Sequence, residues 1–189
     1  MSAESRGMAR PALITVEGVV ESHHLEALWA LYLEAFGPLR TLAAARQVLH
    51  RDEFMDEMSD PRVMKYVAWG EDGSPQAMAT LTADLDAVPW ISPEYYAARY
   101  PEHTARKAVY YWGFALARPD TQTSFLFRKI FQEILTKLAA EKAIVAYDIC
   151  RFNNHTMRFA QQLETVGRRF ADVTVENLDS QNYYSAAIS

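Results

Sequence analysis

A run of polar residues between an apolar strand pattern and an amphipathic helix pattern is the first candidate for chemistry in this chain. The apolar run 109–117 ends before Pro119, which has no N–H to donate to a β-ladder. The polar residues 120–124 can supply capping oxygens to a helix that follows. Such a helix start presents unpaired N–H groups and the positive end of the helix dipole, which suits a phosphate. An ordinary strand-to-helix connection has the same pattern, so both interpretations stay open at this point.

A long connection rich in aromatic residues is the second candidate. About twenty residues, 86–106, separate two strand patterns, and a connection of this length is more often functional than idle. His103 within it can transfer a proton. Its aromatic side chains can either wall a substrate pocket or pin the connection to the body of the protein. These side chains are Trp90, Tyr95, Tyr96 and Tyr100.

A cluster of acidic residues in a helical pattern is the third candidate. A metal site is one interpretation, and a solvated helix face is the favoured one. The cluster consists of Asp52, Glu53, Asp56 and Glu57. The histidines near it in sequence show no spacing typical of metal ligands, so we expect surface or capping roles for His23, His24 and His50. The sequence therefore predicts no bound metal.

The elements that must position these residues follow from hydrophobic periodicity and from turn and capping signals. We expect strands at 12–20, 63–69, 76–84, 109–117 and 143–150, with closing strands at 173–177 and 183–188. We expect helices at 22–36, 41–58 and 153–166, and a central helix that follows the turn 120–124 and carries an apolar stripe from Phe127 to Leu138. This order predicts an α+β fold, an α/β/α sandwich with a mostly antiparallel mixed sheet. Residues 1–10 are expected to form a flexible tail and residues 11–189 a single domain.

In this order of elements the chain resembles the GNAT acyltransferase superfamily. The superfamily's loop between the fourth strand and the central helix reads Val-x-Pro-x-x-[Arg/Gln]-x-x-Gly-x-Gly. Residues 117–127 align with this loop without a gap. Pro119 and Gln122 match it, whereas Phe125 and Phe127 replace both glycines. The loop is therefore similar in its first half and departs from the superfamily in its second.

The last helix pattern is a second place where the chain resembles the superfamily. Members commonly read Asn-x-x-[Ala/Ser]-x-x-[aliphatic]-Tyr-x-x-x-Gly-Phe there. Asn153 matches the first position, which typically contacts the pantetheine. Ala160 stands where the tyrosine that often protonates the departing thiolate would be, and the Gly-Phe signature is missing. The resemblance thus covers nearly the whole chain in element order but is partial in its motifs.

The resemblance implies a sheet that splays between its fourth and fifth strands and leaves N–H and C=O groups free for the two amides of a pantetheine arm. It implies acetyl-CoA or another acyl-CoA as co-substrate, and direct attack of an amine on the thioester. The implied cofactor-binding residues are Phe114, Leu116, Arg118, Gln122, Thr123, Ser124, Phe125, Phe127, Arg128 and Asn153. The candidate catalytic residues are Tyr111, His103 and Asp148, with Glu94 acting through a water as a further candidate base.

The phenylalanines in the loop leave a second donor open. Glycines there let the backbone approach a pyrophosphate closely, and Phe125 and Phe127 would fill that space or face the core. A donor carried on an acyl carrier protein has one phosphodiester and no nucleotide, so it needs the loop less. Arg118, Arg128 and Lys129 could then meet an acidic carrier. The aromatic connection 86–106 would accommodate a longer acyl chain.

Composition limits the remaining function classes. Half of the 189 residues are hydrophobic, which predicts a full core. The net charge of −5 argues against binding nucleic acid, and no apolar stretch approaches the roughly 20 residues of a membrane-spanning helix. The single cysteine, Cys150, fits a reducing cytoplasm. We expect a small-molecule acceptor. A catalytically silent acyl-CoA-binding or regulatory domain stays open as an alternative, as does an interaction subunit that forms a homodimer through exposed aromatic residues.

Overall fold

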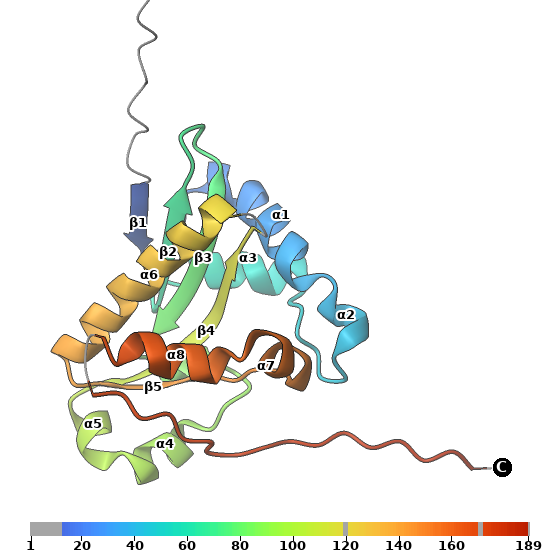
Figure 1. The fold of residues 1–189 in the computed structure, drawn as a ribbon, viewed down its shortest axis with the longest axis vertical. Coiled ribbons are helices and arrows are strands. Elements are labelled where there is room, and N and C mark those ends of the chain that lie inside the picture. The colour runs from blue at the N-terminus through green and yellow to red at the C-terminus, as the bar shows by residue number, and fades with distance from the viewer. Residues whose placement is uncertain (1–12, 119–120, 170–171, 189) are drawn as a thin grey trace, which may run out of the picture.

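The computed structural model describes residues 13–118, 121–169 and 172–188 and is built around one mixed sheet (Figure 1). Within these residues, five strands lie side by side in sequence order, and the first four are antiparallel. The last strand runs parallel to the fourth. The strands are β1 (Leu13–Glu17), β2 (Val63–Trp69), β3 (Pro75–Thr82), β4 (Val109–Ala117) and β5 (Ile144–Ala146). The predicted fold class, α+β with a mostly antiparallel mixed sheet, is confirmed.

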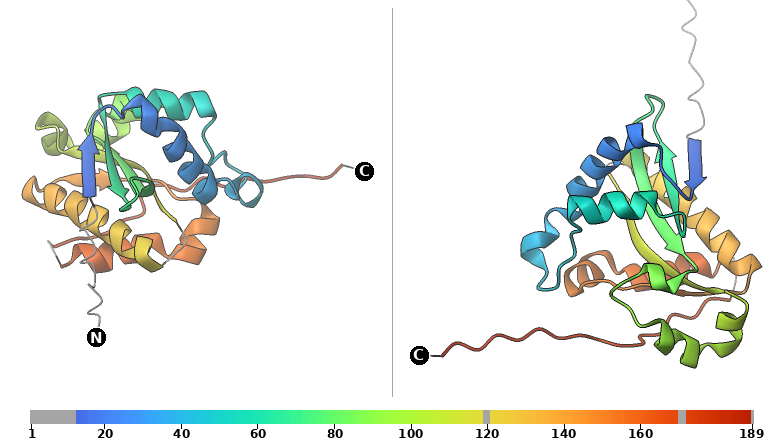
Figure 2. Two further views of the ribbon diagram at one scale, coloured as in Figure 1. Left: turned by 90° about the horizontal axis from the view of Figure 1, so that it is seen from above. Right: turned by 180° about the vertical axis from the view of Figure 1, so that it is seen from behind.

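Two layers of helices cover the two faces of this sheet (Figures 1 and 2). Helices α1, α2 and α3 pack on one face, and α6 and α8 pack on the other. The short helices α4 and α5 lie within the connection between β3 and β4. The helices are α1 (Leu25–Phe36), α2 (Leu39–Leu42), α3 (Arg51–Ser59), α4 (Pro93–Arg99), α5 (Pro101–Ala105), α6 (Thr121–Ala140), α7 (Arg151–Met157) and α8 (Phe159–Gly167), with short 3₁₀ turns at Ser22–His24 and Leu85–Ala87.

Strand β4 changes the faces of its side chains halfway along. Trp112 packs into the α6 layer, whereas Phe114 packs into the α1 layer, although residues two apart in a regular strand share a face. The pairing with β3 gives the reason. Ala79 pairs with Ala115, but Leu81 pairs with Trp112, so β4 holds one more residue than β3 in this interval. This β-bulge re-aims the second half of β4.

The predicted continuous helix over 41–58 is wrong. Helix α2 ends at Leu42, residues 43–50 are irregular, and α3 begins at Arg51. Tertiary contacts hold the irregular segment: the Leu49 N–H donates to the Tyr32 hydroxyl at 3.0 Å, and that hydroxyl donates to the Gln47 carbonyl at 3.4 Å. The buried tyrosine of α1 therefore takes backbone groups that a continuous helix would have used.

The predictions for the last third of the chain are also corrected. The expected helix at 153–166 starts earlier, at Arg151, and is interrupted at Arg158, whose backbone is left-handed at φ 47°. The expected strand at 143–150 shortens to β5. The closing strands expected at 173–177 and 183–188 do not form in the structure, where residues 172–188 are extended but have no ladder partner among the described residues.

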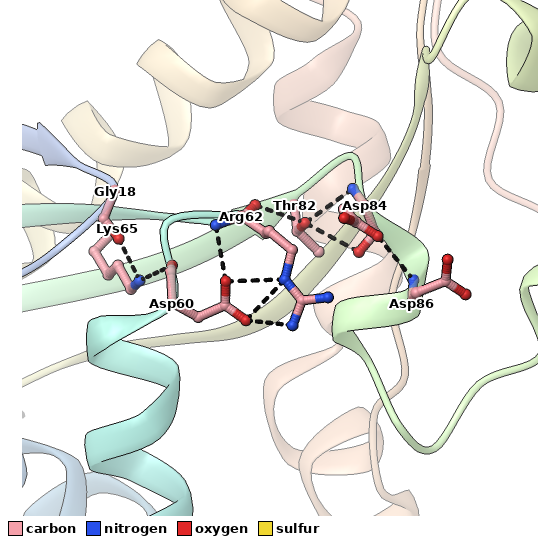
Figure 3. A network of polar contacts seen from close by, with 7 residues as sticks. All are labelled: Gly18, Asp60, Arg62, Lys65, Thr82, Asp84 and Asp86. Atoms are coloured by element: carbon pink, nitrogen blue, oxygen red, sulfur yellow. Dashed lines mark hydrogen bonds and ion pairs between the residues drawn. The ribbon is translucent and has the colours of Figure 1, made fainter.

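A buried lysine fixes α3 against the sheet (Figure 3). The Lys65 Nζ donates to the Gly18 carbonyl and the Asp60 carbonyl, both at 2.7 Å. Burial lowers the pKa of Lys65 to about 8. Beside it, Arg62 pairs with the Asp60 carboxylate at 2.6 Å, and the Thr82 hydroxyl donates to the Arg62 carbonyl at 2.8 Å. These contacts set the end of α3 relative to β1, β2 and β3.

Candidate functional site

The candidate site is the place where β4 and β5 separate. The two strands pair only over Val109–Tyr111 and Ile144–Ala146, and β4 then continues to Ala117 while the chain after β5 leaves the sheet. A cavity of about 590 Å³ opens at this separation, between residues 111–115 of β4 and residues 147–150. The predicted splay between the fourth and fifth strands is confirmed.

The cavity is lined from both faces of the sheet. Tyr32 of α1, the irregular segment 45–49 and Glu57 of α3 contribute from one face. Phe127 of α6 and Gln162 of α8 contribute from the other. The connection that carries α4 and α5 adds Trp90, Ile91 and Tyr96, and α7 adds Asn153. Side chains from both helical layers therefore border the same cavity.

Two backbone donors, one in β4 and one directly after it, point away from the cavity. The Phe114 N–H donates to the Thr80 hydroxyl at 3.2 Å, and the Arg118 N–H donates to the Gln76 carbonyl at 3.1 Å. Both acceptors belong to β3. The N–H groups of residues 114 and 118 therefore face β3 rather than the crevice between β4 and β5.

The peptide groups between these two donors follow by alternation. The N–H and C=O groups of one residue point to the same edge of a strand, and those of the next residue point to the opposite edge. The backbone groups of Leu116 therefore also face β3, whereas those of Ala115 and Ala117 face the crevice. The resemblance implied that Phe114 and Leu116 bind the cofactor, through the backbone groups that the splay leaves free. The bulge shifts this by one residue, because it changes the alternation of β4 before residue 114. Ala115 supplies the crevice-facing peptide group at the cavity wall.

The Glu57 carboxylate lies against the bulge. A Cβ added to Gly113 would lie 2.6 Å from the Thr80 Oγ1 and 3.6 Å from the Glu57 Oε1, so the glycine makes room for both groups. The Thr80 hydroxyl donates to the Glu57 carboxylate and accepts the Phe114 N–H. Burial raises the pKa of Glu57 to about 7, although the hydrogen bond from Thr80 and the charge of Lys65 both act to lower it. A carboxyl group with this pKa can hold or release a proton near neutral pH.

Sequence reasoning missed Glu57, because it assigned the acidic residues of this helix to a solvated face. That interpretation is wrong for Glu57, which lines the cavity. The available signal was its position. Glu57 lies three residues after Phe54 and one before Met58, and both of these are fully buried, so the three share one helix face.

Two of the predicted catalytic residues meet at the inner end of the splay. The Tyr111 hydroxyl donates to the Asp148 carboxylate, and the Trp90 Nε1 donates to both groups, at 3.1 Å to Tyr111 and 3.3 Å to Asp148. Burial, and then the charge of Asp148, raises the pKa of Tyr111 far above its ordinary value. Tyr111 therefore keeps its proton, which favours a donor over a base. Trp90 lines the cavity, and its hydrogen bonds also attach the connection 86–106 to the sheet. The sequence left these two roles open as alternatives.

The other proton-transfer candidates lie elsewhere. The ring of His103, in α5, faces Tyr100 with the centroids 6.4 Å apart, and His103 is not among the residues that line the cavity. Glu94 is exposed at the start of α4, where it accepts a hydrogen bond from the Ser92 hydroxyl at 3.0 Å. The structure does not bring these two side chains to the splay.

The predicted cofactor-binding residues divide into two groups. Phe114, Phe127 and Asn153 line the cavity, whereas Leu116 is buried in the α1 layer. Arg118, Phe125 and Arg128 lie where β4 is followed by α6. The side chains of Gln122, Thr123 and Ser124 lie outside the described residues.

Around the start of α6, charged and aromatic side chains are exposed. Phe125 is 52% exposed, and the Lys129 Nζ lies 4.8 Å from the centre of its ring. Arg128 is exposed, and the Arg118 Nε lies 3.9 Å from the Glu34 carboxylate. Phe125 therefore faces outward near the start of α6, while Phe127 reaches the cavity.

Two other kinds of site were sought in the described part of the chain. No group of three or more histidine, cysteine, aspartate or glutamate side chains lies within it in a position to hold a metal ion. No helix in it combines the length and apolar character needed to span a membrane.

Comparison with known proteins shows where this architecture recurs. No protein-family model matches the chain, and no curated protein matches its sequence. Among solved structures, an aminoglycoside acetyltransferase from an uncultured soil metagenomic sample, in complex with sisomicin, is 12% identical with a TM-score of 0.52 over 93% of this chain and 97% of its own. The 6'-N-acetyltransferase AAC(6')-Ih from Acinetobacter baumannii is 13% identical with a TM-score of 0.52 over 95% and 100%. Aminoglycoside N-acetyltransferase AAC(6')-Iy in complex with CoA is 12% identical with a TM-score of 0.50 over 95% and 98%. At these identities the likeness establishes a shared fold.

Proposed function

We propose that this protein, which has the fold of the GNAT N-acetyltransferases, transfers an acyl group from a pantetheine thioester to an amine by direct attack. One observation carries the proposal: β4 and β5 part, and a cavity of about 590 Å³ opens between them. A pantetheine arm is an extended chain with two amides, so it can pair with the free edge of β4 as an added strand. A solved structure of the same fold contains CoA, which supports an acyl-CoA as the donor.

The thioester carbonyl would lie at the bulge of β4. The Ala115 peptide group faces the crevice there, and its N–H can donate to the oxygen on which charge develops during attack. Residues 114 and 118, by contrast, use their N–H groups to hold β4 to β3. The strand thus fixes its position with one set of peptide groups and offers the other set to the donor.

The amine must lose a proton before or during attack, and Glu57 is the group we assign to this step. Its carboxylate lines the cavity on the α3 side, opposite the layer that holds α6. The Thr80 hydroxyl orients it, and its pKa of about 7 suits a general base near neutral pH. Asp148 offers a second carboxylate on the same cavity to a positively charged acceptor. As the C–N bond forms and the C–S bond breaks, the nitrogen gives up a proton and the departing thiolate takes one up from water, so the products are an amide and a free thiol.

The donor can be CoA-linked or protein-linked. The crevice between β4 and β5 would bind the pantetheine arm, which both donors share. Phe125 faces outward where a nucleotide would approach α6, and Arg128 is exposed beside it. This arrangement is compatible with an acidic carrier protein as well as with CoA. The acceptor is proposed to be a small-molecule amine, and the protein is proposed to act in the cytoplasm.

A binding and transfer experiment tests the proposal. The midpoint of thermal unfolding is measured with acetyl-CoA, a long-chain acyl-CoA and free CoA, because a ligand that binds only the folded state raises the midpoint by mass action. Thiol release is then followed with a panel of amines, using each acyl-CoA and an acyl carrier protein as donors. We expect a shift with at least one thioester and amine-dependent thiol release. A shift without transfer would favour a catalytically silent acyl-CoA-binding domain, and no shift and no transfer from any donor would favour an interaction subunit.

A further inference from the structure

The polar side chains buried between α3 and the sheet lead from a lysine to Glu57. Lys65 of β2 and Thr80 of β3 are both buried, and they are direct partners in the ladder between these strands. Direct partners place their side chains on the same face of a sheet. The Thr80 hydroxyl in turn donates to the Glu57 carboxylate. A cation, a hydroxyl and a carboxyl group therefore share the interface between α3 and the sheet.

The ammonium group of Lys65 lies at the C-terminal end of α3 (Figure 3). Its Nζ donates to the carbonyl of Asp60, the residue that caps this helix, and to the carbonyl of Gly18, both at 2.7 Å. The C-terminus of a helix is the negative end of its dipole. Glu57 lies in the last turn of the same helix, so the dipole disfavours its ionised form. The Lys65 charge at this end opposes that effect.

Holding α3 to the sheet does not by itself require a lysine. Two carbonyl acceptors need two N–H donors, which an uncharged amide could supply, whereas an ammonium group also brings a charge that is costly to bury unbalanced. Both acceptors of the Lys65 Nζ are neutral carbonyls. The carboxylates whose charges act on it are Glu57 and Asp60, and Asp60 is already paired with Arg62. Glu57 is therefore the carboxylate left for the Lys65 charge to balance.

We propose that Lys65 is a positioning residue for Glu57: its buried ammonium group stabilises the ionised carboxylate, so that Glu57 can accept a proton at neutral pH. Lys65 does not line the cavity and so acts only through Glu57. The part of Lys65 in catalysis rests on the proposed acyl transfer. Its effect on the charge of Glu57 is a property of the folded protein and is measurable without any substrate.

The other charged and titratable groups around Glu57 do not supply this charge. Tyr32 of α1 keeps its proton, because burial raises its pKa to about 12. Arg46 of the irregular segment 43–50 is held by Glu53, with its Nη2 at 2.8 Å from a carboxylate oxygen. Asp60, at the end of α3, acts against ionisation of Glu57. The buried lysine is therefore the described cation that lowers the pKa of Glu57.

The two pKa values define the pH range in which this support operates. Burial lowers the pKa of Lys65 to about 8, and the charge of Glu57 acts to raise it. The pKa of Glu57 is about 7, so both groups are charged between pH 7 and 8. At higher pH, Lys65 loses its proton and its support for Glu57 with it.

The pKa of Glu57 in lysine variants tests the inference directly. Carbon-13 NMR of the side-chain carboxyl groups is followed from about pH 5 to about pH 9, and Glu57→Gln identifies the resonance. Lys65→Met removes the charge and the donors, whereas Lys65→Gln removes the charge but keeps two N–H donors. Each variant should raise the pKa of Glu57 by about one unit. If Lys65→Met does not fold, Lys65→Gln decides the question.

Arg51→Gln is the matched control. It removes an exposed cation from the other end of α3, where Arg51 pairs with Glu26, and it should leave the pKa of Glu57 unchanged. A pKa of Glu57 that stays in place in the folded lysine variants would overturn the inference, because Lys65 would then only hold α3 to the sheet.

The rate of acyl transfer gives the second measurement. The rise of kcat/KM with pH should move upward with the pKa of Glu57 in both lysine variants. Their rate at pH 7 should be about five-fold below that of the wild type, and the difference should disappear above about pH 9. A rate profile that stays in place while the pKa moves would overturn the part of Lys65 in catalysis. A moved pKa in a protein that transfers no acyl group would refute the proposed function alone and support the link between Lys65 and Glu57.

Discussion

Replacement of Glu57 by glutamine should change the pH dependence of folding stability by an amount that the structure sets. The pKa of Glu57 rises from an ordinary 4.5 to about 7 on folding. Each unit corresponds to about 1.4 kcal/mol, so ionisation of the folded protein costs up to about 3 kcal/mol. Because the folded pKa is the higher one, the protein keeps its full free energy of unfolding below pH 4.5. It loses up to this amount as the pH rises through about 7. Because Glu57 is only half-buried, screening by solvent makes this figure an upper bound.

The variant Glu57→Gln keeps the volume of the side chain and can still accept the Thr80 hydroxyl, but it cannot ionise. Relative to the wild type, it should therefore gain free energy of unfolding as the pH is raised from 5 to 8, approaching about 3 kcal/mol. Urea unfolding at each pH measures this difference. Asp56→Asn is the matched control, because Asp56 is exposed on the same helix and should not reproduce the gain.

The same carboxyl group should appear in the rate of acyl transfer. The wild-type kcat/KM is expected to rise with pH through about 7, and Glu57→Gln should lose this rise together with about 10²–10⁴-fold in rate. A wild type whose stability does not fall relative to Glu57→Gln would refute the burial argument. A variant that gains stability but keeps the pH-dependent rise in rate would show that Glu57 is buried but is not the base.

Three further predictions concern neighbouring residues. Gly113→Ala should lower the free energy of unfolding by about 1–3 kcal/mol, because its Cβ would meet the Thr80 Oγ1 at 2.6 Å, and the Gly113→Ala, Thr80→Ala double variant should recover part of the loss in urea unfolding. Trp90→Phe should cost about 1 kcal/mol in the same assay, because it removes the Nε1 that donates to two oxygens at the splay. Glycine at both Phe125 and Phe127 should tighten CoA binding in isothermal titration, because glycine lets the backbone approach a pyrophosphate; a double variant that only unfolds would identify Phe127 as a core residue.

The sequence by itself determined the elements that local periodicity encodes. The strand 109–117, the hairpin that joins β2 to β3, and the central helix after Pro119 follow from alternation, turn residues and a 3.6-residue stripe, each read within a short window. The order of these elements, through the resemblance it carried, also predicted the splay between β4 and β5. Tyr111 and Asp148 were candidates by residue type alone.

Only the tertiary structure decided which residues meet and how they face. Tyr111 and Asp148 are 37 residues apart in sequence and form a hydrogen bond only because β5 pairs beside β4. Periodicity could not show that the Tyr32 hydroxyl interrupts a helix, that a bulge turns Ala115 toward the crevice, or that Glu57 lies in the cavity. The physical reason is the same in each case: a local pattern specifies the face on which a side chain lies, but its hydrogen-bond partners and its solvation depend on residues that are distant in sequence.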